Sequence, residues 1–149
     1  MAHFITVPMA DVAFFKQWTT SGGSVHYSLL DEGIPNKNTS DYVTTGLAAK
    51  QDRYDIGAGP EYTDNVDTVH IYMYLNGLYQ SVYPGLTIKL YIFTTEIATH
   101  NYLVDTGGSW ALCRFDFTGL DISGDDFPEL RMGITAFEAI GTEDVPVIE

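Results

Sequence analysis

The sequence is poor in cysteine and in positively charged residues. It has 1 Cys among 149 residues, which excludes an internal disulfide framework and every zinc or iron–sulfur site built from several cysteines. Lys and Arg number 7 against 20 Asp and Glu, so the formal net charge is -13. Because binding to nucleic acid and to anionic membrane surfaces depends on cationic side chains, this balance argues against both kinds of partner.

The chain also lacks long apolar runs. No stretch approaches the roughly 18 apolar residues that cross a bilayer, and residues 1–7 (MAHFITV) lack the basic and apolar regions of a secretory signal. We therefore expect a protein that is made in a cytoplasm. With 45% hydrophobic and 18% charged residues, the composition is that of one globular domain.

Alternating side chains predict strands in the second half of the chain. In residues 69–75 (VHIYMYL) and 86–93 (LTIKLYIF) aliphatic side chains alternate with aromatic or polar ones, which gives each strand one aliphatic face. Residues 110–117 and 130–140 show the same pattern less cleanly. Asn76-Gly77 follows the first of these strands and predicts a chain reversal there. The expected fold is all-β, an antiparallel, jelly-roll-like β-sandwich.

Residues 1–17 do not show the clear alternation of the predicted strands. Residues 11–18 show weak helical periodicity and fit either a helical turn or an irregular strand. We expect residues 1–17 to form an N-terminal arm or edge segment and residues 18–149 to form the sandwich as a single domain.

The cysteine, histidine and acidic residues give no specific indication of catalytic or metal chemistry. Cys113 lies in phase with Phe115 and Phe117 and is expected to pack as a small hydrophobe. The histidines are dispersed and predict no zinc site. The densest group of oxygen ligands favours a solvated turn over a structural calcium site, because its spacing does not match a known calcium loop. It comprises Asp121, Ser123, Asp125, Asp126 and Glu129, and the acids Glu61, Asp64 and Asp67 are interpreted in the same way.

Aromatic residues give the strongest functional indication. Tyr72 and Tyr74 project from one predicted strand, and Tyr91 and Phe93 from another, in each case opposite to the aliphatic face. If both aliphatic faces point into the core, these four rings form one outer stripe. Such a stripe is covered by the protein's own N-terminal segment, binds sugar, or packs against another protein.

From Trp18 onward the chain resembles a β-sandwich family common among tailed-bacteriophage structural proteins. The resemblance rests on Trp18, Gly22-Gly23-Ser24, residues 27–32 (YSLLDE), residues 40–43 (SDYV), Asp67-Thr68-Val69, Trp110 and the connection 120–130 into a Leu-Arg-Met-Gly-Ile strand. Residues 35–38 (PNKN) depart from the family, which more often carries Asp there. A cation held by those acids in relatives is therefore not expected in this chain.

The resemblance implies a non-enzymatic capsid decoration (cement) protein on the exterior of the virion. Its partner would be the major capsid protein, which it would join as a homo-oligomer, a trimer or a dimer, without a cofactor. The apolar N-terminal segment, with Phe4, Ile5 and Val7, would reach a neighbouring subunit.

Two alternatives stay open from the sequence. The first is a carbohydrate-binding module of the tail-fibre or head-fibre type, which recognises the host surface with the rings of Tyr72, Tyr74, Tyr91 and Phe93. The second is a carbohydrate-active enzyme that uses two of the acids as general acid and base.

Overall fold

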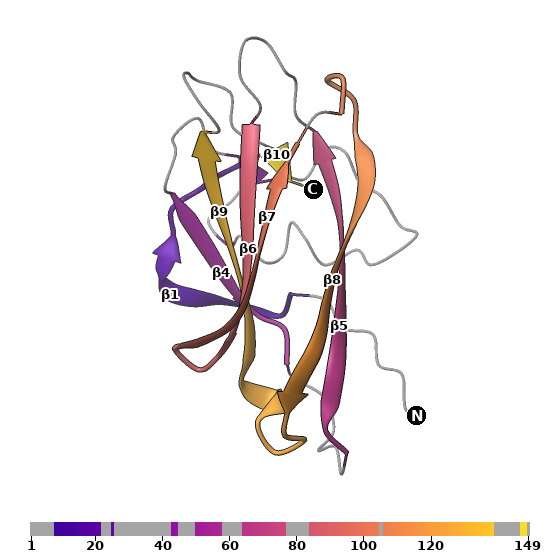
Figure 1. Cartoon of the computed structure of the whole chain (residues 1–149). Helices are drawn as coiled ribbons and strands as arrows, with labels where there is room; N and C mark the ends of the chain where they lie inside the picture. Colours follow the sequence, from indigo (N-terminus) through magenta and orange to yellow (C-terminus); the bar gives the residue numbers. More distant parts are fainter. Residues whose placement is uncertain are drawn as a thin grey trace.

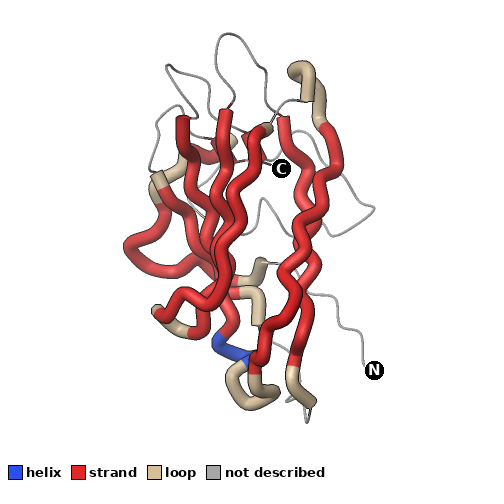
Figure 2. The backbone as a smooth tube through the Cα atoms, viewed as in Figure 1, coloured by secondary structure: helices blue, strands red, loops and turns tan. Residues whose placement is uncertain are grey.

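The computed structural model describes residues 8–21, 25, 43–44, 50–57, 64–76, 84–104, 106–138 and 147–148. These residues form two antiparallel sheets that pack face to face (Figures 1 and 2). The predicted all-β, antiparallel sandwich is confirmed. Among the described residues, no helix has the length and apolar character needed to cross a membrane.

Sheet A is the larger of the two in paired length. Its strands are β1 (Ala10–Lys16), β4 (Gln51–Asp55), β9 (Leu130–Glu138), β6 (Pro84–Ile92) and β7 (Thr95–Leu103), and their order in the sheet is β1-β4-β9-β6-β7. Residues 11–16 therefore belong to a strand and not to a helical turn. Strand β1 lies at the edge of sheet A and pairs with β4.

Sheet B contains two long strands and three short ones. The long strands are β5 (Val66–Asn76) and β8 (Ala111–Ile122), and the short ones are β2 (Thr19–Thr20), β3 (Val43–Thr44) and β10 (Val147–Ile148). Their order is β2-β3-β10-β5-β8. A short 3-10 helix, η2 (Phe127–Glu129), joins β8 to β9 and so connects the two sheets.

The chain changes sheet between β5 and β6. The predicted reversal at Asn76-Gly77 reaches into residues 77–83, which lie outside the described part of the chain, and the flanking strands β5 and β6 belong to different sheets. Strand β6 instead forms a hairpin with β7, through a turn at Phe93 and Thr94. The alternation in residues 86–93 indicated β6 correctly, whereas the mixed sequence of β7 gave no clear strand pattern.

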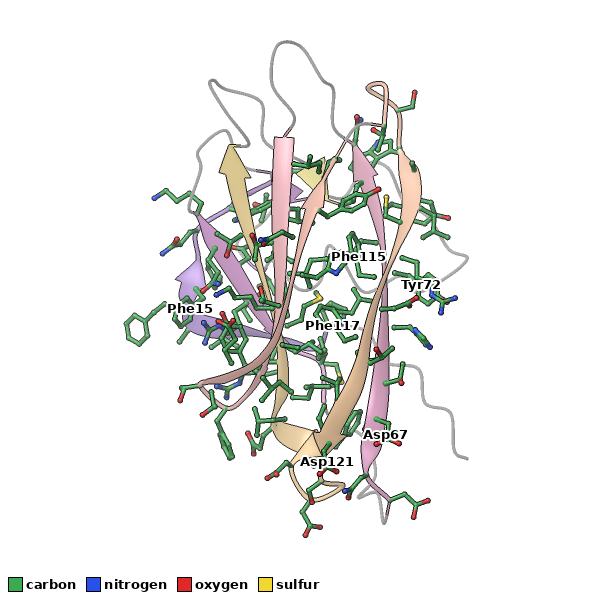
Figure 3. All side chains as sticks on the ribbon, viewed as in Figure 1. Phe15, Asp67, Tyr72, Phe115, Phe117 and Asp121 are labelled. Carbon is green, nitrogen blue, oxygen red and sulfur yellow. The ribbon has the colours of Figure 1, made fainter. Side chains whose placement is uncertain are left out.

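The aliphatic faces of β5 and β6 do meet in one core. Ile71, Met73 and Leu75 of β5 are buried together with Leu86, Ile88 and Leu90 of β6. Phe115 and Phe117 of β8 project between the two sheets (Figure 3). Cys113 is partly buried and packs against this core, in line with its predicted role as a small hydrophobe.

Strand β1 bulges away from its partner. Asp11 pairs with Tyr54 and Lys16 pairs with Asp52, so β1 advances five residues while β4 advances two. Phe14, inside this bulge, has a φ of 72° and is 94% exposed. A bulky side chain rarely adopts a positive φ, so the bulge holds Phe14 in a strained conformation that presents its ring to solvent.

Candidate functional site

The four rings expected to form one stripe lie on opposite surfaces of the sandwich. Tyr72 and Tyr74 belong to β5 and face outward from sheet B, as Figure 3 shows for Tyr72. Tyr91 belongs to β6 in sheet A, and Phe93 lies in the turn that follows. The expectation of one continuous stripe is therefore wrong, because whether two strands share a sheet is not visible in their local patterns.

Tyr91 is also buried, with 5% of its surface exposed. Its ring leans across Gly133 of β9, where any Cβ atom would lie 2.9 Å from the Cε2 of Tyr91. Its other neighbour is the guanidinium of Arg53, whose Cζ lies 3.7 Å from the ring centroid. The ring is thus part of the sheet surface and offers no free face to a partner.

Arg53 lies between two aromatic rings on the outer face of sheet A. Its Cζ is 3.9 Å from the centroid of Phe15, in β1, and 3.7 Å from that of Tyr91. Contacts of this kind hold a desolvated guanidinium through the negative faces of the rings. Arg53 is 6% exposed and forms no ion pair with a described carboxylate. Its Nε is buried and has no hydrogen-bond partner among the described residues.

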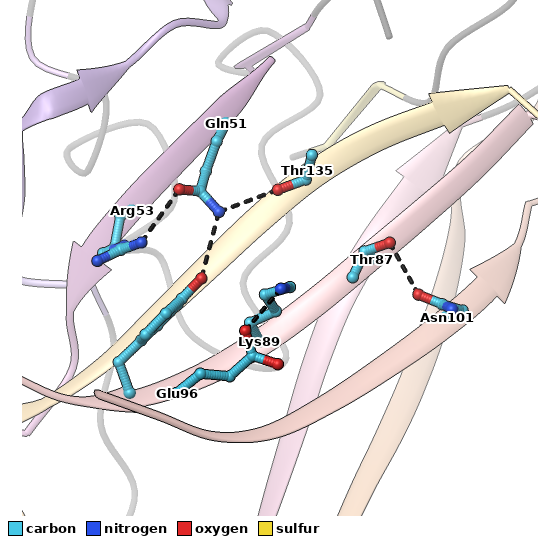
Figure 4. A network of polar contacts seen from close by, with 8 residues as sticks. Gln51, Arg53, Thr87, Lys89, Glu96, Asn101 and Thr135 are labelled. Carbon is cyan, nitrogen blue, oxygen red and sulfur yellow. Dashed lines mark hydrogen bonds and ion pairs between the residues drawn. The ribbon is translucent and has the colours of Figure 1, made fainter. Parts of the chain in front are cut away.

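A row of polar side chains continues from Arg53 across sheet A (Figure 4). Arg53 Nη2 donates to Gln51 Oε1 at 3.2 Å, and Gln51 Nε2 donates to Thr135 Oγ1 at 3.0 Å and to Tyr91 Oη at 3.4 Å. The row therefore links β4, β9 and β6. Each of these side chains is positioned by a neighbouring strand.

Two further pairs extend the row onto β6 and β7. Lys89 Nζ donates to Glu96 at 2.6 Å, and Thr87 Oγ1 donates to Asn101 Oδ1 at 2.8 Å (Figure 4). The hydrogen bond to Glu96 raises the pKa of Lys89 above its ordinary value, so the ammonium stays charged at neutral pH. We call this surface the polar face of sheet A. It comprises Gln51, Arg53, Thr87, Lys89, Glu96, Asn101 and Thr135, with Phe15 at its β1 end.

The polar face of sheet A was not among the sites predicted from the sequence. Strand β4, with the sequence QDRYD, has no aliphatic face, and its local composition is typical of a charged loop. Gln51, Arg53 and Asp55 nevertheless follow the period of two that is expected of a strand. In residues 86–93 the alternation did place Thr87 and Lys89 opposite to the aliphatic side chains. Period-two polar residues in both segments were the signal that could have identified the face.

Sheet B presents a different outer face. Tyr72 is 43% exposed, and the Arg114 Cζ lies 5.7 Å from its ring centroid. Arg114 Nε donates to Asp116 Oδ1 at 2.6 Å, and His70 Nδ1 lies 2.6 Å from the same oxygen. The hydrogen bonds from Arg114 and His70 hold the pKa of Asp116 below its ordinary value. This face is an exposed charged cluster beside one accessible ring.

Those of the remaining predicted residues that the structure describes form no second polar row. Phe4, Ile5 and Val7 lie outside the described residues. Asp121 accepts a hydrogen bond from Asn65 Nδ2 at 2.6 Å, close to the end of the sandwich where Figure 3 shows Asp67 as well. Within the described part of the chain, no group of three or more His, Cys, Asp or Glu side chains is arranged to hold a metal ion.

Comparisons with known proteins give a likeness in fold. No protein-family model matches the chain, and no curated protein matches its sequence. A family 35 carbohydrate-binding module from an environmental isolate is 12% identical with a TM-score of 0.46, over 94% of this chain and 89% of that one. BiXyn10A CBM1 in its apo form is 15% identical with a TM-score of 0.43, over 99% of this chain and 89% of that one.

At these identities the likeness concerns the β-sandwich architecture alone. It assigns no ligand and no site to this chain. The expected membership of a phage structural family, the capsid partner, the homo-oligomer and the virion location are not addressed by the comparisons and stay predictions.

Proposed function

We propose that this chain is a non-catalytic module that binds neutral carbohydrate through the polar face of sheet A. The observation that carries this proposal is a row of polar side chains on four neighbouring strands, ordered by three separate groups of hydrogen bonds, beside a ring on the edge strand. The carbohydrate-binding alternative drawn from the sequence is thereby kept, but its site moves from a stripe of rings to this face.

The row contains both hydrogen-bond donors and hydrogen-bond acceptors. Gln51 and Asn101 each offer both a carbonyl oxygen and an amino group, Lys89 offers only donors, and Glu96 offers only acceptors. A sugar hydroxyl donates one hydrogen bond and accepts others, so a mixed row fits a sugar better than it fits an ion of one sign. Such a row can contact several hydroxyl groups of an extended saccharide in turn.

The row is held in place before any ligand binds. Thr135 fixes Gln51, and Glu96 fixes Lys89, through hydrogen bonds between strands that are themselves paired. Long side chains lose roughly 0.5–1.5 kcal/mol each when a ligand immobilises them. Side chains that are already ordered avoid much of this cost, which favours a weakly interacting ligand such as a sugar.

Phe15 supplies apolar surface at the β1 end of the face, and its neighbour in β1, Phe14, is also exposed. The ring of Phe15 covers the guanidinium of Arg53 and is partly exposed, and that of Phe14 is almost fully exposed. Aromatic rings contribute large apolar areas at low conformational cost, and the C–H face of a pyranose can stack on them. The polar row and the rings together offer both kinds of contact that a sugar needs.

Electrostatics favour a neutral ligand and binding without hydrolysis. The net charge of -13 repels polyanionic polysaccharides. Glu96, on this face, and Asp55, beside Arg53 on β4, form ion pairs with Lys89 and Arg131, respectively. Glycoside hydrolysis uses two carboxylates on either side of the bond, one of them protonated, and paired carboxylates of this kind are poorly suited to that role.

Affinity electrophoresis tests the proposal directly. Gels that contain hydroxyethylcellulose, mannan or arabinoxylan are expected to retard the full chain, and the variant Glu96→Ala/Asn101→Ala is expected to bind about tenfold more weakly, because it loses two hydrogen-bonding side chains. Both residues are exposed on the edge strand, so the variant should fold.

The matched control lies on the opposite surface. Tyr72→Ala/Asp116→Ala also removes two exposed side chains, but from sheet B. This control is expected to bind like the wild type. Loss of binding in the control, with retention in the Glu96→Ala/Asn101→Ala variant, contradicts the assignment to sheet A. An absence of binding to a full array of neutral glycans contradicts the function itself.

A further inference from the structure

A groove lies at one end of the sandwich, apart from the polar face. Its volume is about 470 Å³, and its walls come from the β6–β7 hairpin on one side and from the end of β8 on the other. Most of its lining is aliphatic or aromatic, and its polar side chains are mainly carboxylates. The lining includes Phe93, Ile97, Gly119, Leu120, Asp121 and Asp126.

Two backbone irregularities shape the groove. Phe93 has a φ of 54°, and its backbone is held by a hydrogen bond from its N–H to Glu129 O and one from Arg131 Nη1 to its carbonyl. Its ring is 51% exposed. On the other wall, the register between β5 and β8 shifts around Gly119, which has a φ of 69°. Both walls thus depart from regular strands where they face the groove.

The groove also lies beside two strand edges. Strand β7 ends sheet A and β8 ends sheet B, and no described strand pairs with the outer edge of either. These two strands contact each other across the sandwich. Strand edges of this kind can accept an added strand through their unpaired backbone groups, and β7 carries neither Pro nor Lys, the usual means of blocking such an edge.

The charge at the groove selects the kind of occupant. Asp121 and Asp126 are both exposed, and Asp121 is oriented by the hydrogen bond from Asn65. A groove that combines aliphatic lining with two exposed carboxylates complements an aliphatic stem that ends in a cation, which is the chemistry of a lysine side chain. A second copy of this chain is a poor occupant, because two bodies of net charge -13 repel each other.

We propose that this groove binds an extended segment of another protein in which aliphatic residues and lysine occupy every second position in turn, so that both kinds of side chain lie on one face of the segment. The segment would add to the outer edge of β7, with which no described strand pairs, and would place its aliphatic side chains on Ile97 and Leu120 and a lysine ammonium at Asp121 and Asp126. This site is separate from the polar face of sheet A, so a protein that binds carbohydrate there can still bind a protein partner at the end of the sandwich.

Nuclear magnetic resonance titration of the full chain tests this site with two matched peptides. The probes are an acetylated, amidated hexapeptide of sequence Val-Thr-Lys-Thr-Val-Thr, which places Val and Lys on one face of the strand, and the same peptide with Glu in place of Lys. We expect the Lys peptide to shift the backbone amides of Thr95, Ile97, Leu120 and Ile122, and the Glu peptide to shift none of them. Shifts spread evenly over the surface, equal shifts with the Glu peptide, or no shifts with either contradict the proposal.

Two variants distinguish binding in the groove from general electrostatic attraction of the cationic peptide to the acidic protein. Asp126→Asn removes one carboxylate at the rim, and Asp116→Asn removes one exposed carboxylate from the outer face of sheet B, so both change the net charge equally. We expect Asp126→Asn to weaken binding of the Lys peptide about two- to fivefold, as loss of one exposed ion pair does, and Asp116→Asn to leave it unchanged. Equal weakening by the two variants overturns the assignment. The amide spectrum of each variant reports directly whether it is folded.

Discussion

The ring of Tyr91 on β6 lies across Gly133 on β9, so closely that a Cβ atom at position 133 would be 2.9 Å from the Cε2 of Tyr91. This contact is what turns Tyr91 from a free outward ring into one wall of the Arg53 stack. It therefore determines the shape of the polar face of sheet A, and several consequences can be measured.

Gly133→Ala is expected to destabilise the protein. The added methyl group must displace the Tyr91 ring, and overpacking of this kind costs about 1–3 kcal/mol in the free energy of unfolding. Urea denaturation measures the cost in two backgrounds, wild type and Tyr91→Ala. In the second background the clash is absent, so the penalty should largely disappear. An equal penalty in both backgrounds contradicts the contact.

Replacing Asp52 is expected to cost more than replacing any exposed carboxylate. Asp52 is 1% exposed and accepts hydrogen bonds from the backbone N–H groups of Gln17 and Trp18, at 2.6 Å and 2.9 Å, and from Tyr54 Oη at 3.0 Å. Asp52→Ala leaves these donors without an acceptor, which should lower the free energy of unfolding by about 3–5 kcal/mol.

Asp52→Asn provides the control for that experiment. The amide keeps one acceptor oxygen, so this variant should lose less stability than Asp52→Ala in the same urea denaturation. Equal losses would mean that the carboxylate acts through its charge and not through the hydrogen bonds that connect β4 to the end of β1.

Stability is expected to fall at alkaline pH through Tyr54. Burial, with the neighbouring Asp52 carboxylate as a second cause, raises the pKa of Tyr54 well above its ordinary value. In the unfolded chain a tyrosine ionises near pH 10, so the contribution of Tyr54 is complete below about pH 10 and is lost as the pH rises above it.

The free energy of unfolding, measured in urea at several pH values on either side of about pH 10, tests this dependence. It should decrease steeply with rising pH in the wild type and less steeply in Tyr54→Phe, which cannot ionise. The same slope in both proteins would show that other groups cause the alkaline loss.

The alternation in the sequence predicted the core correctly but not the surface. Ile71 and Ile88 face the core as expected, because period-two patterning depends only on neighbouring residues in one strand. The position of the rings depends on sheet order, and sheet order depends on contacts between distant segments. Tyr91 is buried by Gly133 and Arg53, and neither residue is close to it in the sequence.

Strand β4 was also not predictable from its local sequence, because polar residues are buried in it. Its sequence QDRYD is mostly polar, yet Asp52, Arg53 and Tyr54 are all buried. Hydrogen bonds from the end of β1 satisfy Asp52, and rings from two other strands cover Arg53. Since these partners come from other segments, a local pattern could not identify either the strand or the polar face that it supports.

Phe14 is expected to lower the stability of the protein while it contributes to carbohydrate binding. Its φ of 72° strains a side chain that is 94% exposed, so Phe14→Asn should raise the free energy of unfolding by about 0.5–1 kcal/mol, because Asn tolerates this conformation better. The same variant should bind carbohydrate more weakly if the ring takes part in binding, because it removes exposed apolar surface from β1, the strand that also carries Phe15. Urea denaturation and affinity electrophoresis of one preparation measure both effects. Lower stability together with unchanged binding contradicts this role for Phe14.

Binding of carbohydrate to the polar face of sheet A is best tested by mapping the contact on the intact chain. Backbone and side-chain amide shifts would be followed by nuclear magnetic resonance while cellohexaose, mannohexaose and xylohexaose are added in turn. At least one of these saccharides should shift the side-chain amides of Gln51 and Asn101 together with the backbone amides of Lys89 and Thr135. If every saccharide that binds instead shifts Tyr72 and Arg114 on sheet B and leaves the polar face unchanged, the account of this protein is contradicted.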